Sequence, residues 1–265
     1  MCIRDSASGL VYLFGIPIAP ASYLPYAISL SVILQVIFLP ILGAIADYSH
    51  LRKQMLMLFA TLGACTTLSM FFISGDLWWL GGVLFILANL CFGASMVFYN
   101  AYLPDISSPD QRDRVSSFGW AMGYLGGGLL LLLNLLLFQF SDALGISSGL
   151  AIRINLASAG LWWLGFSLIT WRNLRSRHAR RELPANENYV SVGFKQLRQT
   201  FRELKHYPNT IQFLLAYLIY NDGVQTVIAV SAIFGAEELG LDVGTLSMVI
   251  LLVQFVQSWR YMNTP

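Results

Sequence analysis

The chain has 265 residues, of which 56% are apolar and only 11% are charged, and its mean hydropathy is +0.62. Soluble globular domains have about 45–50% apolar and about 25% charged residues, so this composition argues against a soluble enzyme domain. An aromatic content of 14% excludes a disordered chain, and three cysteines exclude a disulfide scaffold. The net charge of +2 gives no case for nucleic-acid binding. The composition indicates a protein of the lipid bilayer.

Apolar stretches of membrane-spanning length follow one another along most of the chain. A spanning helix needs about 20 mostly apolar residues. The predicted spans are Tyr23–Ala46, Met55–Ile73, Trp78–Tyr99, Val115–Phe138, Leu150–Trp171, Ile211–Phe234 and, shorter than the others, Thr245–Trp259. Ala7–Ala19, interrupted by Pro17, is too short to span, and we expect an extramembrane loop or the stump of a helix there. The expected fold class is all-α, a polytopic transmembrane helical bundle.

Basic residues lie in alternate connections between these spans. One set of loops carries two basic residues after the first span, Arg112 and Arg114 after the third, and nine between Arg172 and Lys205. The other set, 74–77, 139–149 and 235–244, carries none. Because cytoplasmic loops collect Lys and Arg, we expect the basic set to face the cytoplasm.

The longest basic connection separates two groups of spans. Its first part is polar, and its second part places apolar residues such as Phe194 and Leu197 at helical spacing among cations. This pattern predicts either a helix that lies in the cytoplasmic interface or a helix packed on its own bundle. We expect three regions: 1–171, a first bundle; 172–209, a basic cytoplasmic linker with that helix; and 210–265, the start of a second bundle.

The end of the first span carries an acid and two bases at regular spacing. Gly43 permits close approach of a neighbouring helix, and Asp47 follows four residues later on the same helical face. Arg52 and Lys53 come in the next turn. We expect this acid–base set to latch the loop to a neighbouring helix end as a gate, with a simple positive-inside turn as the alternative.

Four stretches of the chain together resemble a known family. They are Gly43–Lys53, Tyr99–Asp105, Ser117–Gly128 and Tyr220–Thr226. The first resembles the signature loop of the major facilitator superfamily, with Tyr48 and His50 departing from the usual pattern. The other three are similar to its vacuole-effluxer branch, relatives of the yeast autophagy-linked exporter of amino acids from the vacuole. The resemblance covers nearly the whole chain beyond residue 20.

The resemblance implies a partial major facilitator fold with helices two to seven and part of helix eight. On this plan helix one would precede residue 7 and helices nine to twelve would follow residue 265, so we expect the sequence to be a fragment. It further implies an integral multi-pass protein, in the inner membrane of a bacterium or a vacuolar-type membrane of a eukaryote.

A carboxyl group lies near the centre of the sixth predicted span. Asp222 is the only acidic residue in such a position, and Tyr220, Asn221 and Gln225 flank it. Polar residues are costly within the membrane, and transporters place substrate and ion sites in polar, interrupted midplane helices. The motif predicts a substrate or proton path, with a structural hydrogen-bonded role as the alternative.

The end of the third span and the start of the fourth carry further candidates. We expect Tyr99 and Asn100 on the solute path and Asp105 in a second gate with Arg112 or Arg114, with a helix terminus bearing interfacial tyrosines as the alternative. Glycines of the fourth span should let helices pack closely; they are Gly119, Gly123, Gly126 and Gly127.

No catalytic constellation, metal-ligand spacing or nucleotide-binding loop occurs in the sequence. We therefore expect no enzyme and no cofactor, but a secondary active transporter of small, amino-acid-like solutes that works by alternating access. Its expected partners are the solute, the lipid bilayer and, as an open option, protons; we expect no nucleic acid and a monomer. The gate at Asp47, Arg52 and Lys53 should bias the outward-open state. A nontransporting membrane scaffold or sensor is the alternative.

Overall fold

The computed structural model describes residues 11–13, 16–18, 20–74, 77–175 and 189–263. Its elements in chain order are β1 (Val11–Leu13), β2 (Ile16–Ile18), α1 (Pro20–Tyr48), α2 (Arg52–Ser69), η1 (Met70–Phe72), α3 (Trp78–Ile106), η3 (Pro109–Gln111), α4 (Arg112–Gln139), α5 (Ser148–Asn173), α6 (Tyr189–Leu204), α7 (Pro208–Glu237) and α8 (Val243–Met262). Each predicted span lies within one long helix, except that Met55–Ile73 runs from α2 through η1 and ends one residue beyond it. The all-α fold class is confirmed, apart from the two short strands.

Within the described part of the chain, five helical segments are long and apolar enough to cross a membrane: Ser22–Tyr48, Arg52–Phe72, Trp79–Ile106, Pro109–Gln139 and Ser148–Asn173. α7 adds a sixth if its two parts, which meet at a bend of 42°, form one span. The expected seventh span, α8, is not among them. Its C-terminal part carries Gln254, Gln257, Ser258 and Arg260, which lower its hydropathy.

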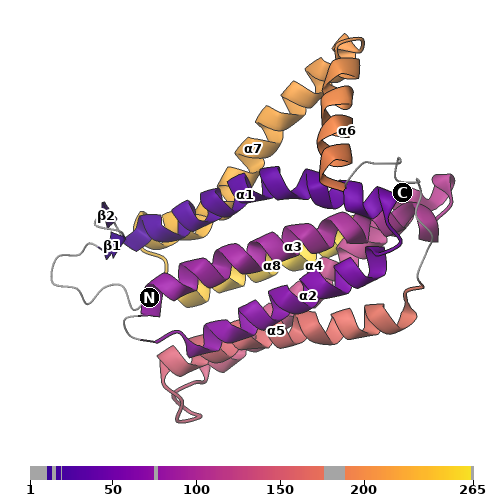
Figure 1. Ribbon diagram of the computed structural model, residues 1–265. Coiled ribbons are helices and arrows are strands. Elements are labelled where there is room, and N and C mark those ends of the chain that lie inside the picture. The colour runs from indigo at the N-terminus through magenta and orange to yellow at the C-terminus, as the bar shows by residue number, and fades with distance from the viewer. Residues whose placement is uncertain (1–10, 14–15, 19, 75–76, 176–188, 264–265) are drawn as a thin grey trace.

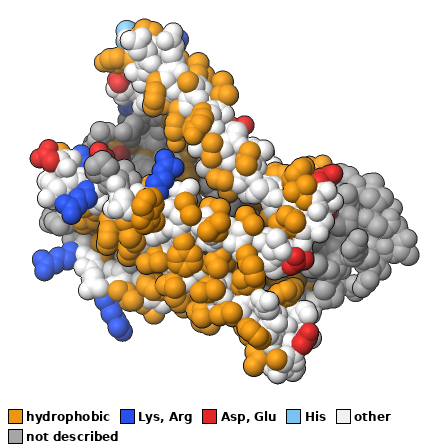
Figure 2. Space-filling view, turned by 180° about the vertical axis from the view of Figure 1, so that it is seen from behind, with side chains coloured by type: hydrophobic (Ala, Val, Ile, Leu, Met, Phe, Trp, Pro, Cys, Tyr) orange, Lys and Arg blue, Asp and Glu red, His pale blue; other side chains and the backbone are white. Residues whose placement is uncertain are grey.

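The long helices pack side by side in one bundle, and α6 with α7 projects from it as a hairpin (Figure 1). α2 packs against α3 and α5, α1 against α3, and α4 against α8. The basic α1–α2 and α3–α4 connections lie at the same end of the bundle (Figure 1). Figure 2 shows Lys and Arg gathered at this end and apolar side chains over the middle of the visible face. This is the distribution that a bilayer requires of a spanning bundle.

The segment before α1 forms a two-stranded antiparallel sheet in which Tyr12 pairs with Pro17. Of the two expectations for Ala7–Ala19, the helix stump is therefore wrong for the described residues 11–13 and 16–18; residues 7–10, 14, 15 and 19 lie outside the described part. The β-branched residues Val11, Ile16 and Ile18 favour a strand over a helix. A proline is tolerated here because both strands of a two-stranded sheet are edges.

α6 packs against α1 through a small residue. A Cβ at Gly193 would lie 3.1 Å from the Cβ of Ala44 and 3.4 Å from the Pro40 carbonyl oxygen, so the two backbones are close. Val192 beside it is 4% exposed, while Phe194 and Leu197 stay largely exposed. Of the two sequence-based alternatives, this contact supports the helix packed on its own bundle. The boundaries of the basic linker stay a prediction, since residues 176–188 lie outside the described part.

Glycines allow a close helix crossing between α2 and α5. A Cβ at Gly160 would lie 2.8 Å from the backbone oxygen of Ala64 and 2.8 Å from the backbone nitrogen of Leu68. From α5, the Trp163 ring fills the space over Gly63. The two helices can approach this closely only because both positions lack a side chain.

Polar side chains join further helix pairs inside the bundle. Asn89 of α3 donates to the hydroxyl of Ser31 in α1 at 2.7 Å. Asn155 of α5 donates to the Asn134 carbonyl of α4 at 3.0 Å, and the Ser158 hydroxyl donates to the Asn134 side-chain oxygen at 2.9 Å. These bonds satisfy polar groups that would be costly in hydrocarbon.

Candidate functional site

A cavity of about 660 Å³ opens between α3 and α4. Its α3 wall repeats at helical spacing, with Phe92, Met96, Tyr99, Asn100, Leu103 and Ile106. Its α4 wall does the same, with Ser116, Gly119, Trp120, Gly123, Tyr124 and Gly127. Residues three and four apart share one face of a helix, so each wall is a single helical face. The volume falls within the range of small-molecule sites, about 300–1,000 Å³.

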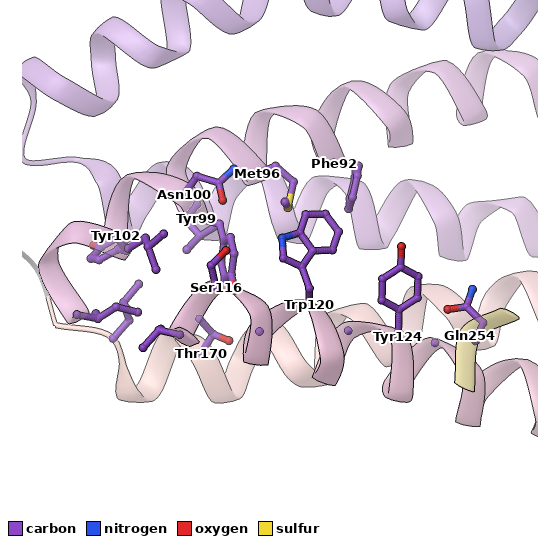
Figure 3. A pocket seen from close by; sticks show the side chains of 18 residues that line it. Phe92, Met96, Tyr99, Asn100, Tyr102, Ser116, Trp120, Tyr124, Thr170 and Gln254 are labelled. Carbon is purple, nitrogen blue, oxygen red and sulfur yellow. The ribbon is translucent and has the colours of Figure 1, made fainter. Parts of the chain in front are cut away.

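The lining combines aromatic rings with neutral hydrogen-bonding groups (Figure 3). Two amides line the cavity, Asn100 from α3 and Gln254 from α8. Hydroxyl groups come from Tyr99, Tyr102, Ser116, Tyr124 and Thr170. None of the lining residues described is Asp, Glu, Lys, Arg or His. Such a lining can orient an uncharged polar group but gives no counter-charge to an ion.

The predicted packing glycines contact three different neighbours. A Cβ at Gly119 would lie 3.0 Å from the Tyr99 hydroxyl of α3, and one at Gly126 would lie 3.7 Å from the Trp162 indole nitrogen of α5. A Cβ at Gly127 would lie 3.7 Å from the Gln254 side-chain oxygen of α8. Gly123 lines the cavity and has nothing within 4 Å of its Cβ position. The neighbouring side chain is thus close at Gly119, at an ordinary contact distance at Gly126 and Gly127, and absent at Gly123 among the described residues.

One end of the cavity lies next to a buried ion pair. The Arg52 guanidinium at the start of α2 is 3.0 Å from the Asp105 carboxylate near the end of α3, and its side chain is 1% exposed. The Arg52 Nε–H also donates to the Ala46 carbonyl at the end of α1. Leu103 and Ile106, which flank Asp105 in sequence, line the cavity. Arg52 thus joins the start of α2 to the ends of α1 and α3 beside the cavity.

Helix polarity accounts for the position of this arginine. The last carbonyl groups of a helix have no intrahelical partner and carry partial negative charge. α1 and α3 both end where α2 begins, so a cation at the first residue of α2 faces both. The intervening turn closes when the Leu51 amide donates to the Ser49 hydroxyl at 3.0 Å.

The predicted first gate is only partly assembled around Arg52. Asp47 and Gly43 instead line a smaller cavity of about 320 Å³ between α1, α3 and α6. Gly43 has nothing within 4 Å of its Cβ position, so it makes no close helix approach to any described residue. Lys53 is half-buried at the second position of α2. Their gating role stays a prediction.

The predicted second gate gains an unexpected member. Asp105 contacts Arg52, from the first predicted gate, at a sequence separation of 53 residues. Arg112 begins α4 with its Nε buried and without a hydrogen-bond partner among the described residues, and Arg114 is exposed. Pairing of Asp105 with Arg112 or Arg114 stays a prediction. The structure joins the two predicted gates through Arg52.

The polar group of the sixth span lies apart from the α3–α4 cavity. Asp222, Tyr220 and Gln225 are exposed on α7, and Asn221 is half-buried. None of the four lines the cavity between α3 and α4, whereas Tyr99 and Asn100 do. The structure thus does not bring the two predicted parts of the solute path together. A role of Asp222 in transport stays a prediction.

Trp120, Tyr124 and Gln254 are among the cavity residues that sequence reasoning missed. For the first two a signal existed, since Ser116, Trp120 and Tyr124 recur every four residues opposite the same face of α3. For Gln254 there was none, because only the packing of α8 against α4 brings it to the cavity.

Apolar helices of spanning length around a solute-sized cavity define a multi-pass helical membrane protein. The family model described as "Vacuole effluxer Atg22 like" matches residues 1–263. The chain belongs to this family of membrane transporters, as the sequence-based resemblance predicts.

Curated relatives agree with this assignment. "Uncharacterized MFS-type transporter YxiO" of Bacillus subtilis is 29% identical over 89% of this chain and 54% of its own length. "Autophagy-related protein 22-1" of Penicillium rubens is 23% identical over 98% of this chain and 56% of its own length. "Autophagy-related protein 22" of Yarrowia lipolytica is 27% identical over 92% and 54%. The chain thus spans about half the length of the curated relatives it matches. No solved structure gives a significant match.

Proposed function

We propose that this chain forms part of a secondary active transporter that carries small solutes of no net charge, amino acids first, by alternating access. The observation that carries this proposal is the lining of the α3–α4 cavity. Two amides, several hydroxyls and the rings of Tyr99, Trp120 and Tyr124 surround a solute-sized space.

The chemistry of this lining supports solutes without net charge. An ion that leaves water needs a counter-charge or several strong hydrogen bonds, and otherwise its transfer costs several kcal/mol. The described lining carries no charged side chain. The amides and hydroxyls can hydrogen-bond the ammonium and carboxylate groups of an amino acid whose net charge is zero, while the aromatic rings contact its apolar part.

The Arg52–Asp105 pair gives the proposed transport cycle a two-state element. Because the pair ties the start of α2 to the ends of α1 and α3, one arrangement of these ends is favoured while it is intact. Displacement of either side chain would release the helix ends, and Asp47 and Lys53 would adjust the balance between the two states. Proton coupling through Asp222 is part of this proposal.

A flux measurement on the full-length protein in proteoliposomes tests the proposal. Labelled leucine, phenylalanine, glutamine and serine are compared with labelled lysine and glutamate, each with and without a proton gradient. We expect uptake of neutral amino acids and little of the charged ones. The absence of flux for every solute would support the scaffold or sensor alternative, and faster flux of charged amino acids would contradict the assigned solute class.

A further inference from the structure

Gln254 differs from the other polar residues of the cavity in its position along the chain. Asn100 and Ser116 lie on α3 and α4, and Thr170 lies on α5, all before the basic connection. Gln254 lies on α8, after it, and among the described residues no other lining residue does. In Figure 3 it lies at the α8 end of the row of polar side chains, next to Tyr124.

Two glycines of α4 make the place that Gln254 occupies. The Cβ of Gln254 lies 3.3 Å from the position of a Cβ at Gly128, and its side-chain oxygen lies 3.7 Å from that of a Cβ at Gly127. A larger residue at either position would meet the side chain of Gln254. The hydroxyl of Ser258, one turn further along α8, donates to the Ala121 carbonyl at 3.1 Å and fixes this register.

The amide of Gln254 is held at the cavity without a partner of its own. It makes no hydrogen bond with any residue in the described part of the chain, although Gln254 is half-buried. The amide is open to the cavity, and its oxygen and its nitrogen both keep hydrogen-bonding capacity there. A polar group of a bound solute would satisfy it.

We propose that Gln254 is a specificity-determining residue that hydrogen-bonds the polar group of the solute from the α8 side, in a place made by Gly127 and Gly128. The inference rests on the proposed transport function. A solute bound to Tyr124 and Gln254 at once bridges helices that precede and follow the basic connection. Occupancy of the cavity then favours the arrangement in which α8 is seated on α4.

The test compares three variants of the full-length protein in proteoliposomes, with the labelled neutral amino acid that gives the fastest wild-type flux. Gln254→Leu removes the amide at similar volume, and we expect KM to rise roughly tenfold, the loss of one or two neutral hydrogen bonds, with little change in Vmax or protein yield. Gly127→Val keeps the amide but displaces it, and should raise KM in the same direction.

Gln257→Leu is the matched control, because it makes the same chemical change on the same helix at a position that does not line the cavity. We expect its KM to equal that of the wild type. Wild-type flux with an unchanged KM in Gln254→Leu would overturn the role of Gln254 alone. An equal rise in KM for Gln257→Leu would overturn it as well, since the effect would then belong to α8 as a whole. Absence of wild-type flux for all solutes would overturn the transport function and this inference together.

Discussion

The Arg52 guanidinium contacts the Asp105 carboxylate at 3.0 Å and joins the start of α2 to the end of α3 beside the α3–α4 cavity. Two motifs that are far apart in the sequence thus form one site. The pair is nearly sealed from solvent on the arginine side and open on the aspartate side, with exposed side-chain fractions of 1% and 19%. Because the Asp105 side chain is partly accessible to solvent and the Arg52 side chain is buried, the carboxylate is the partner that can move away into water.

Breaking this pair from either side should destabilise the bundle. Arg52→Gln leaves Asp105 unpaired, and Asp105→Asn leaves a buried cation; loss of one partner of a buried pair typically costs about 3–5 kcal/mol. We expect both variants to lower the thermal unfolding temperature in detergent. Lys53→Gln, at the neighbouring half-buried position, is the control and should change little. If the loss of stability in the double variant Arg52→Gln/Asp105→Asn equals the sum of the losses in the two single variants, the residues do not act as a pair.

The α2–α5 crossing should not tolerate a methyl group at Gly160. A Cβ there would lie 2.8 Å from backbone atoms of Ala64 and Leu68, which cannot move aside without shifting the helix. We expect Gly160→Ala to cost about 1–3 kcal/mol, the usual range for overpacking, measured as a lower unfolding temperature in detergent. Gly165→Ala is the control on the same helix, because nothing lies within 4 Å of its Cβ position. Equal effects at both positions would contradict the close crossing.

The contact between α4 and α8 can be tested by cross-linking. The Cβ of residue 254 lies 3.3 Å from a Cβ built at position 128, close to the spacing of disulfide-bonded residues, about 3.5–4.5 Å. We expect Gly128→Cys/Gln254→Cys to form a disulfide under mild oxidation. The cross-link is detected as fragments that stay joined after cleavage at a protease site placed within residues 176–188. The control pair Gly165→Cys/Gln254→Cys should give no cross-link.

The start of α8 should respond to acid. The Asp242 carboxylate caps this helix, and hydrogen bonds from the Thr245 hydroxyl and then the Thr245 amide lower its pKa below the ordinary value. A carboxylate with a lowered pKa stabilises the folded state above its ordinary pKa, and this stabilisation is lost as the pH falls through the lowered value. Hydrogen exchange at the first amides of α8 should accelerate over that acid range. Asp242→Asn can still cap but cannot titrate, and it should abolish the pH dependence.

Asp222 is the residue on which proton coupling can be decided. Replacing it with Asn removes the proton that a carboxyl can carry at nearly constant shape. We expect Asp222→Asn to abolish the effect of a proton gradient on uptake by the full-length protein in proteoliposomes. Glu237→Gln makes the same change from acid to amide at the exposed end of α7, keeps Asp222 and should leave gradient-driven uptake in place. Unchanged gradient-driven transport by Asp222→Asn would contradict its role.

Hydropathy predicted the helices well because a bilayer leaves a spanning segment few alternatives to a helix. Their ends were harder to predict, since a helix ends where its hydrogen bonding ends and not where its apolar residues do. α3, for example, continues beyond the predicted end at Tyr99 to Ile106 and contains Pro104.

Contacts between distant segments could not be read from the sequence. The cations nearest to Asp105 in sequence are Arg112 and Arg114, and only the packing of three helix ends brings Arg52 to it instead. Gln254 belongs to a polar run at the end of α8, and its place at the cavity depends on two glycines of another helix. Tyr99 and Asn100 were found because they lie on the wall of the cavity and also end a predicted span.

The hydrogen bond that anchors α8 on α4 depends on a side chain at one end, the Ser258 hydroxyl, and on the backbone at the other, the Ala121 oxygen. Every amino acid supplies that oxygen, so substitution at position 121 leaves the acceptor in place as long as the new side chain fits. The donor exists only while residue 258 has a hydroxyl or an equivalent group. Among natural variants, substitutions at 121 should therefore be limited by the size of the side chain, and substitutions at 258 by the need for a hydrogen-bond donor.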